Sequence, residues 1–166
     1  MLHPLIEQLH FTRNEWLRAF EGVTIEEAAR EFGTMNTIGW MVGHLAWHEQ
    51  LYWLQRAQGK MVSEAVLQCG SGQPRCTPPL DEMWQAWHAI TAASEPYLDT
   101  ITTDTLQEYL NIDGKPHLET IGTMLRRMTY HYWFHLGEGQ AIRQLLGHTN
   151  LPSFVGNINA APYRPE

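Results

Sequence analysis

The chain has 166 residues, 43% of them hydrophobic and 17% charged, and its 11 Lys and Arg against 18 Asp and Glu give a formal net charge of −7. This length and composition exclude an intrinsically disordered chain and predict one domain with its own core. The lack of a basic run excludes a phosphate-tracking nucleic-acid surface, and the lack of ~18 consecutive apolar residues or of a signal pattern predicts a cytoplasmic protein without a membrane partner.

The first third of the chain predicts three helical segments. Apolar side chains recur every three or four positions through residues 4–20, which indicates a helix with one buried face. Residues 24–30 begin with a capping box and predict a short helix. A second long helix is expected to be capped within residues 34–37 and to end near Gly59, with His44 and His48 on its apolar face.

The middle of the chain predicts a long connection and a third helix. Residues 60–79 are rich in Gly and Pro and are expected to carry the chain from one end of a helical bundle to the other. Thr77 is a plausible cap for a third helix, which Pro96 should kink or end.

The last third predicts a turn, a long helix and an irregular tail. Asp113-Gly114 is a strong hairpin signal, so a small two-stranded excursion or a simple loop is expected before the fourth helix. That helix should begin between His117 and Thr120, carry Leu118 in its buried stripe and end at Gly147. Residues 151–166 should be irregular and lie over a surface or a partner subunit. With no internal repeat, an all-α domain of four amphipathic helices over residues 1–166 is the economical architecture.

Two His-x-x-x-His pairs carry the sharpest chemical signal. Residues four apart share a helix face, so His131 and His135 project with Glu138 from one side of the last helix, and His44 and His48 do so upstream. A lone buried histidine is more often a hydrogen-bonded core residue, but two such pairs in a small chain favour a metal site. Helices two and four can be neighbours in a bundle, so either upstream histidine could supply a third ligand.

Three histidines with an open fourth position form a catalytic type of site for zinc, nickel or a related ion. Neither pair has the Glu after its first His that a zinc protease requires. The carboxylates of a di-iron bundle are missing as well. Cys69 and Cys76 lie in a Gly/Pro/Ser-rich segment without redox or zinc-ribbon spacing, and no role is predicted for them.

Residues 37–44 (TIGWMVGH) and 130–138 (YHYWFHLGE) resemble the two signatures of the DinB-like (YfiT-like) metalloenzyme family. The resemblance implies an up-up-down-down four-helix bundle with a long crossover connection, commonly a homodimer. It also implies a divalent metal, zinc or nickel, bound by His44, His131 and His135. His48 matches a less constant position and is a candidate fourth ligand, ligand-orienting group or general base. Glu138 stands where many relatives carry Gln, and it could orient a ligand histidine or serve helix packing.

Three functions remain open from the sequence. The resemblance implies a transferase that uses a low-molecular-weight thiol, with a small-molecule substrate in a pocket lined by Trp40, Trp47, Tyr132 and Trp133. Acidic groups of such a thiol could reach only Arg126 and Arg127, which are expected to face solvent. Metal-dependent hydrolysis fits the same residues, and so does a non-catalytic bundle that binds metal or dimerises.

Overall fold

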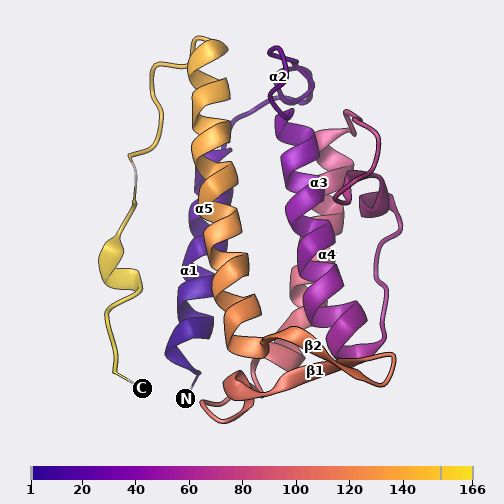
Figure 1. Ribbon diagram of the computed structural model, residues 1–166. Helices are drawn as coiled ribbons and strands as arrows, with labels where there is room; N and C mark the ends of the chain where they lie inside the picture. Colours follow the sequence, from indigo (N-terminus) through magenta and orange to yellow (C-terminus); the bar gives the residue numbers. More distant parts are fainter. Residues whose placement is uncertain (1, 154, 166) are drawn as a thin grey trace.

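The computed structural model describes residues 2–153 and 155–165, which form five α-helices and one small antiparallel sheet (Figure 1). The predicted helical character is therefore confirmed, together with the two-stranded excursion. A π-helical segment, Gln50–Arg56, continues the third of these helices directly. The elements are α1 (Pro4–Ala19), α2 (Ile25–Ala28), α3 (Ile38–Glu49), α4 (Leu80–Leu98), β1 (Tyr109–Ile112), β2 (Lys115–Thr120) and α5 (Ile121–Leu145), with short 3₁₀ turns at Ala65–Cys69, Thr105–Gln107 and Ile158–Ala160.

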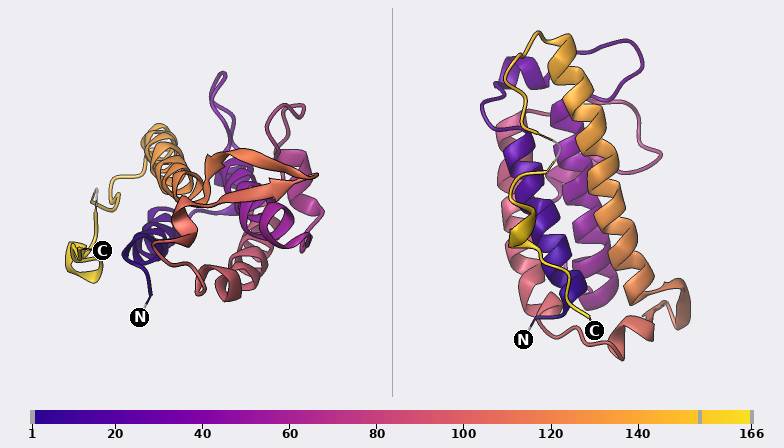
Figure 2. Two further views of the ribbon diagram at one scale, coloured as in Figure 1. Left: turned by 60° about the horizontal axis from the view of Figure 1, so that its bottom comes forward. Right: turned by 90° about the vertical axis from the view of Figure 1, so that its left-hand side faces the viewer.

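The four long helices lie side by side, and α1 and α5 run in the direction opposite to α3 and α4 (Figures 1 and 2). In chain order the directions are up, down, down and up, so the predicted up-up-down-down order is wrong. The reason lies in the connections. The short link through α2 stays at one end and makes α1 and α3 antiparallel, whereas residues 60–79 return along the length of the helices and make α3 and α4 parallel.

The hairpin forms where the Asp-Gly pair predicts a turn. Asp113 and Gly114 have φ angles of 52° and 79°, the left-handed conformation that this dipeptide tolerates. Strand β2 continues to Thr120, whose hydroxyl accepts a hydrogen bond from the backbone N–H of Thr123 and caps α5. Leu118 is consequently in the strand and 96% exposed, so its predicted place in a buried helical stripe is wrong.

The ends of α4 also differ from their prediction. The cap residue is Pro79 rather than Thr77, and it offers no side-chain hydrogen bond. Pro96 lies inside the last turn, and the helix ends two residues later at Leu98, in agreement with the expectation that this proline would kink or end it.

A buried polar network joins all four long helices. The Arg13 guanidinium on α1 donates to both carboxylate oxygens of Glu49 on α3, each at 2.8 Å, and to Glu95 on α4 at 2.5 Å. The Tyr132 hydroxyl on α5 donates to Glu49 at 2.9 Å and accepts from the Trp87 indole on α4 at 2.7 Å. The helices are therefore held in one relative arrangement by groups that cannot be left unpaired in the interior.

The C-terminal segment lies along α1 of its own chain (Figures 1 and 2). Arg18 donates to the backbone oxygen of Ser153 at 2.8 Å, Glu15 accepts from the N–H of Gly156 at 3.0 Å, and Arg164 pairs with Glu7. Apart from one 3₁₀ turn the segment is irregular, as predicted. Within the described ranges, no helix combines the length and apolar character needed to cross a membrane.

Candidate metal centre

The two histidine pairs, one on α3 and one on α5, meet inside the molecule. His44, His48 and His135 are at most 9% exposed, and His131 is half-buried. The ring centroids of His44 and His131 are 4.9 Å apart, and those of His131 and His135 are 4.7 Å apart. The sequence prediction that the pairs face the interior is confirmed, and their proximity follows from the packing of α3 on α5.

The hydrogen bonds of the outer ring nitrogens fix which nitrogens point inward. Nδ1 of His44 lies 2.7 Å from the backbone oxygen of Cys69, which can only accept, so His44 carries its proton on Nδ1 and has a bare Nε2. Nδ1 of His135 donates to a Glu138 carboxylate oxygen at 2.9 Å, which leaves its Nε2 bare as well. His131 turns Nδ1 to His48, at 2.6 Å, and Nε2 to Nε2 of His135, at 3.0 Å.

This donor set fits a divalent metal ion. One ring nitrogen from each of His44, His131 and His135 lies within 4.8 Å of the other two. Ligand nitrogens around a tetrahedral zinc lie roughly 3.3 Å apart, given bonds of ~2.0–2.1 Å, so small side-chain rotations would suffice. Nε2 of His131 lies 3.0 Å from the bare Nε2 of His135, so with the His131 proton on Nδ1 two lone pairs face each other, an arrangement that a cation would satisfy. The outer nitrogens of His44 and His135 already have the carbonyl and carboxylate partners that metal-bound histidines usually have, and that of His131 has the imidazole of His48.

Burial keeps these imidazoles neutral. Desolvation lowers the pKa of His44 to about 4 and, together with the neighbouring histidines, that of His131 to about 2. The same cause lowers the pKa of His48 to about 3, and it lowers the pKa of His135 even though Glu138 opposes the shift. Neutral imidazole is the form that binds a metal, so no proton has to leave at neutral pH.

Two tryptophans hold the ring of His44 instead of lining a pocket. The indoles of Trp40 and Trp47 are stacked with this imidazole at centroid distances of 4.4 and 5.4 Å. Tyr132 is fully buried in the polar network. The predicted pocket lining is wrong, because the cavity beside the site is bordered by none of its four residues, Trp40, Trp47, Tyr132 and Trp133.

Glu138 combines the two roles that the sequence left open. Besides its bond with His135, it accepts hydrogen bonds from the backbone N–H and the side-chain amide of Asn36, both at 3.1 Å. It therefore orients a histidine and ties α5 to the segment before α3. Sequence reasoning missed Asn36, because only the folded chain brings it to Glu138.

Cys69 contributes through its backbone. Its side chain is fully buried rather than exposed in a loop, and burial raises the pKa of its thiol above the usual range, which disfavours a reactive thiolate. Its carbonyl oxygen is the partner that orients His44. The segment that holds Cys69 was expected to be only a connection, yet it completes the surroundings of the site.

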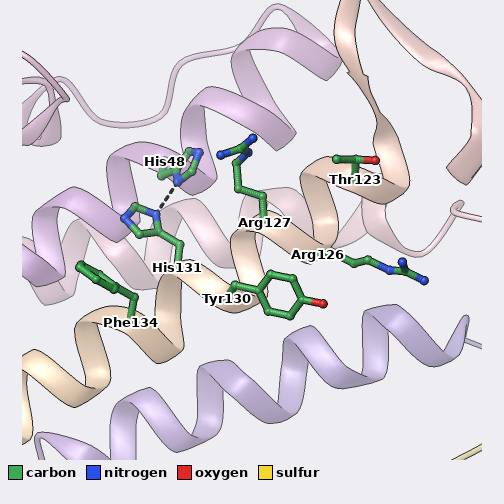
Figure 3. Close-up of a pocket in the computed structure, with 7 residues that line it drawn as sticks. All are labelled: His48, Thr123, Arg126, Arg127, Tyr130, His131 and Phe134. Carbon is green, nitrogen blue, oxygen red and sulfur yellow. Dashed lines mark hydrogen bonds between the residues drawn. The ribbon is translucent and has the colours of Figure 1, made fainter.

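A pocket of about 730 Å³ opens beside the histidines (Figure 3). His48 borders it from α3, and its other lining residues come from α5: Thr123, Arg126, Arg127, Tyr130, His131 and Phe134. Both arginines are exposed, as the sequence predicts, and they also border this pocket. The helical period could have suggested this face, because these residues recur three or four positions apart.

A family of known proteins matches the part of the chain that contains the site. The family model described as the DinB superfamily matches residues 8–138, which include all four histidines and Glu138. A comparison with curated proteins gave no match.

Proposed function

The chain belongs to the DinB superfamily, and from this premise we propose that it is a divalent-metal-dependent enzyme whose ion is held by His44, His131 and His135. The observation that carries the proposal is the convergence of three inward nitrogens whose outer nitrogens all have partners. Zinc and nickel are the preferred ions, because neutral imidazole suits both.

The same proposal includes the architecture around the site. We take the four long helices as one four-helix bundle in a single domain over residues 1–166, with the crossover between α3 and α4. The polar network that joins the four helices supports this proposal. A homodimer, implied by the family resemblance, is part of the proposal and is tested by sedimentation equilibrium.

An ion held by three histidines keeps a position at which it can polarise a substrate atom or lower the pKa of a bound group. Glu138 and the Cys69 carbonyl would hold His135 and His44 in the tautomer that presents Nε2. His48, which accepts the proton of His131 Nδ1, is a positioning residue in this scheme, and it also borders the pocket. The pocket is large enough for a small-molecule substrate.

The reaction class that we favour is transfer involving a low-molecular-weight thiol, which rests on the family resemblance. Hydrolysis of a small molecule is the alternative on the same site, and a non-catalytic metal-binding bundle is the alternative without turnover. Incubating zinc-loaded protein with a thiol and an electrophile separates these cases. Formation of a thioether supports transfer, and cleavage of the substrate without the thiol supports hydrolysis. If neither product forms, the result supports the non-catalytic bundle.

Metal analysis of protein purified without a histidine tag tests the metal site. We expect about one equivalent of transition metal, and chelation should lower the melting temperature because the ion binds only the folded state. Less than about a tenth of an equivalent, with unchanged melting after chelation, would contradict the proposal.

Single substitutions test the ligand set. His44→Ala, His131→Ala and His135→Ala should each remove most of the metal. His48→Ala should remove less, because the hydrogen bond of His48 is to the outer nitrogen of His131 and not to the inward nitrogen that would bind the ion. Equal metal loss at positions 44 and 48 would count against the assignment of three ligands.

A further inference from the structure

The pocket beside the histidines has a positively charged lining, although the chain as a whole is negatively charged. The whole sequence carries a net charge of −7, yet the pocket lining contains two arginines and no carboxylate. Arg127 is paired with Glu119 on β2. Among the described residues, Arg126 has no hydrogen bond or ion pair to another side chain, so its guanidinium is available to a ligand.

Hydrogen-bond direction makes His48 a second donor in this pocket, a step that rests on the proposed metal site. If Nε2 of His131 is a ligand, its proton is on Nδ1 and is donated to Nδ1 of His48, 2.6 Å away. Neutral His48 must then carry its own proton on Nε2. Figure 3 shows this nitrogen on the side of His48 that faces Arg127. The pocket therefore presents N–H donors, which a ligand with acceptor oxygens would satisfy.

Two exposed aromatic side chains form part of the pocket wall: Tyr130 lies between the histidines and Arg126, and Phe134 lies beyond His131. Tyr130 and Phe134 are 66% and 70% exposed, although large side chains of this kind are usually covered, and both line the pocket. Figure 3 places the histidines and Arg126 toward opposite ends of the pocket, with Tyr130 between them. Arg126 and His131 are five positions apart on one helix, a separation of about 7.5 Å along its axis.

We propose that this pocket binds an elongated small molecule that carries an anionic oxygen group, a carboxylate or a phosphate, at one end. The anionic group contacts Arg126, the apolar body lies against Tyr130, and the other end reaches His48 and His131, next to Phe134. This assignment names the substrate class of the proposed enzyme. A site of this kind differs from a surface that attracts any anion in two ways. Arg126 and the histidines contact opposite ends of the ligand, and the anionic group is bound by one unpaired guanidinium, that of Arg126.

Binding of two matched probes tests the assignment. Ligand-observed NMR titration of the zinc-loaded protein should give 3-phenylpropanoate at least about tenfold higher affinity than its neutral amide, 3-phenylpropanamide, as expected for a charge-assisted hydrogen bond. Arg126→Gln should reduce this ratio to less than about threefold. Arg30→Gln is the control, since it makes the same change in net charge at an exposed arginine whose recorded contact is with the ring of Phe32. It should leave the ratio unchanged.

Equal affinity for the acid and the amide, or equal effects of the two arginine substitutions, would overturn the assignment. Zinc content measured on the same samples separates this result from failure of the metal site. Bound zinc without a preference for the acid refutes the pocket assignment alone. A preference for the acid that depends on Arg126 in protein that holds no zinc refutes the metal proposal alone and supports the pocket.

Discussion

Replacing Glu138 by alanine should weaken metal binding without unfolding the protein. The carboxylate accepts from Nδ1 of His135 at 2.9 Å and from two N–H groups of Asn36 at 3.1 Å. Without it, His135 loses the partner that fixes its tautomer and ring orientation. Loss of such a partner typically lowers metal affinity by about 10- to 100-fold, which corresponds to about 1.4–2.7 kcal/mol.

The same substitution also has a structural cost, which must be measured separately. The backbone N–H of Asn36, a half-buried residue, loses its acceptor, so the cost in folding stability should be at most the ~1–3 kcal/mol of a fully buried unsatisfied donor. Zinc affinity is measured by competition with a chromophoric chelator. The free energy of unfolding is measured on the metal-free protein, so that the two effects are not confused.

Asn36→Ala is the matched control. It removes the side-chain amide but keeps the bond between His135 and Glu138, so zinc affinity should stay within about threefold of the parent value. A folded Glu138→Ala variant that binds zinc as tightly as the parent would refute the idea that this carboxylate orients the histidine. Equal losses in both variants would place the effect in helix packing instead.

Three further predictions concern stability. Burial lowers the pKa of the site's four histidines below the unfolded value of ~6.5, so the unfolded state of the metal-free protein binds more protons at acid pH. Its stability should fall by up to about 1.4 kcal/mol per pH unit for each of His44, His48 and His131 between pH ~6.5 and the lowered pKa of that histidine, and His135 should act in the same direction, so the melting temperature should fall as the pH is lowered. A flat melting temperature from pH 7 to pH 5 would contradict this. Gly139→Ala should destabilise the protein by about 1–3 kcal/mol, because the added methyl group would overlap the ring of Phe20. The control is Gly137→Ala, whose methyl group meets open space and should stabilise α5 by up to about 1 kcal/mol. Equal melting temperatures of the two variants would refute the close contact between Gly139 and Phe20. Arg13→Met should cost about 3–5 kcal/mol in urea unfolding, since Glu49 would remain buried without its cation, and a cost below about 1 kcal/mol would show that the pair is dispensable.

Local signals predicted most of the elements and half of the site. Three local structures could be predicted because each depends only on neighbouring residues: the capping box at Thr24, the Asp113-Gly114 turn and Gly147 just after the end of α5. The two histidine pairs belong to this class, because an i,i+4 spacing on an apolar helix face determines direction without knowledge of the fold.

The missed features depend on contacts between distant segments. Arg13 reads as an ordinary polar position, and its burial becomes tolerable only because Glu49 and Glu95 lie 36 and 82 residues further on. Asn36 reaches Glu138 across 102 residues. The return of residues 60–79 along the helices agrees with its prediction from composition, whereas the up-up-down-down order that the resemblance implies is wrong because the short link through α2 makes α1 and α3 antiparallel.

The buried network and the candidate metal site are neighbours in sequence as well as in space, and this explains how the histidines are positioned. Glu49 follows His48 on α3 and Tyr132 follows His131 on α5, and the two network residues share a buried hydrogen bond of 2.9 Å. A slip of α5 by one residue would shift it by about 1.5 Å and turn it by about 100°, which would break this bond and the His48–His131 contact together. Breaking a buried charged contact costs several kcal/mol, so the network opposes any other register. The charges that sequence reasoning missed therefore keep the histidines that it found within reach of one another.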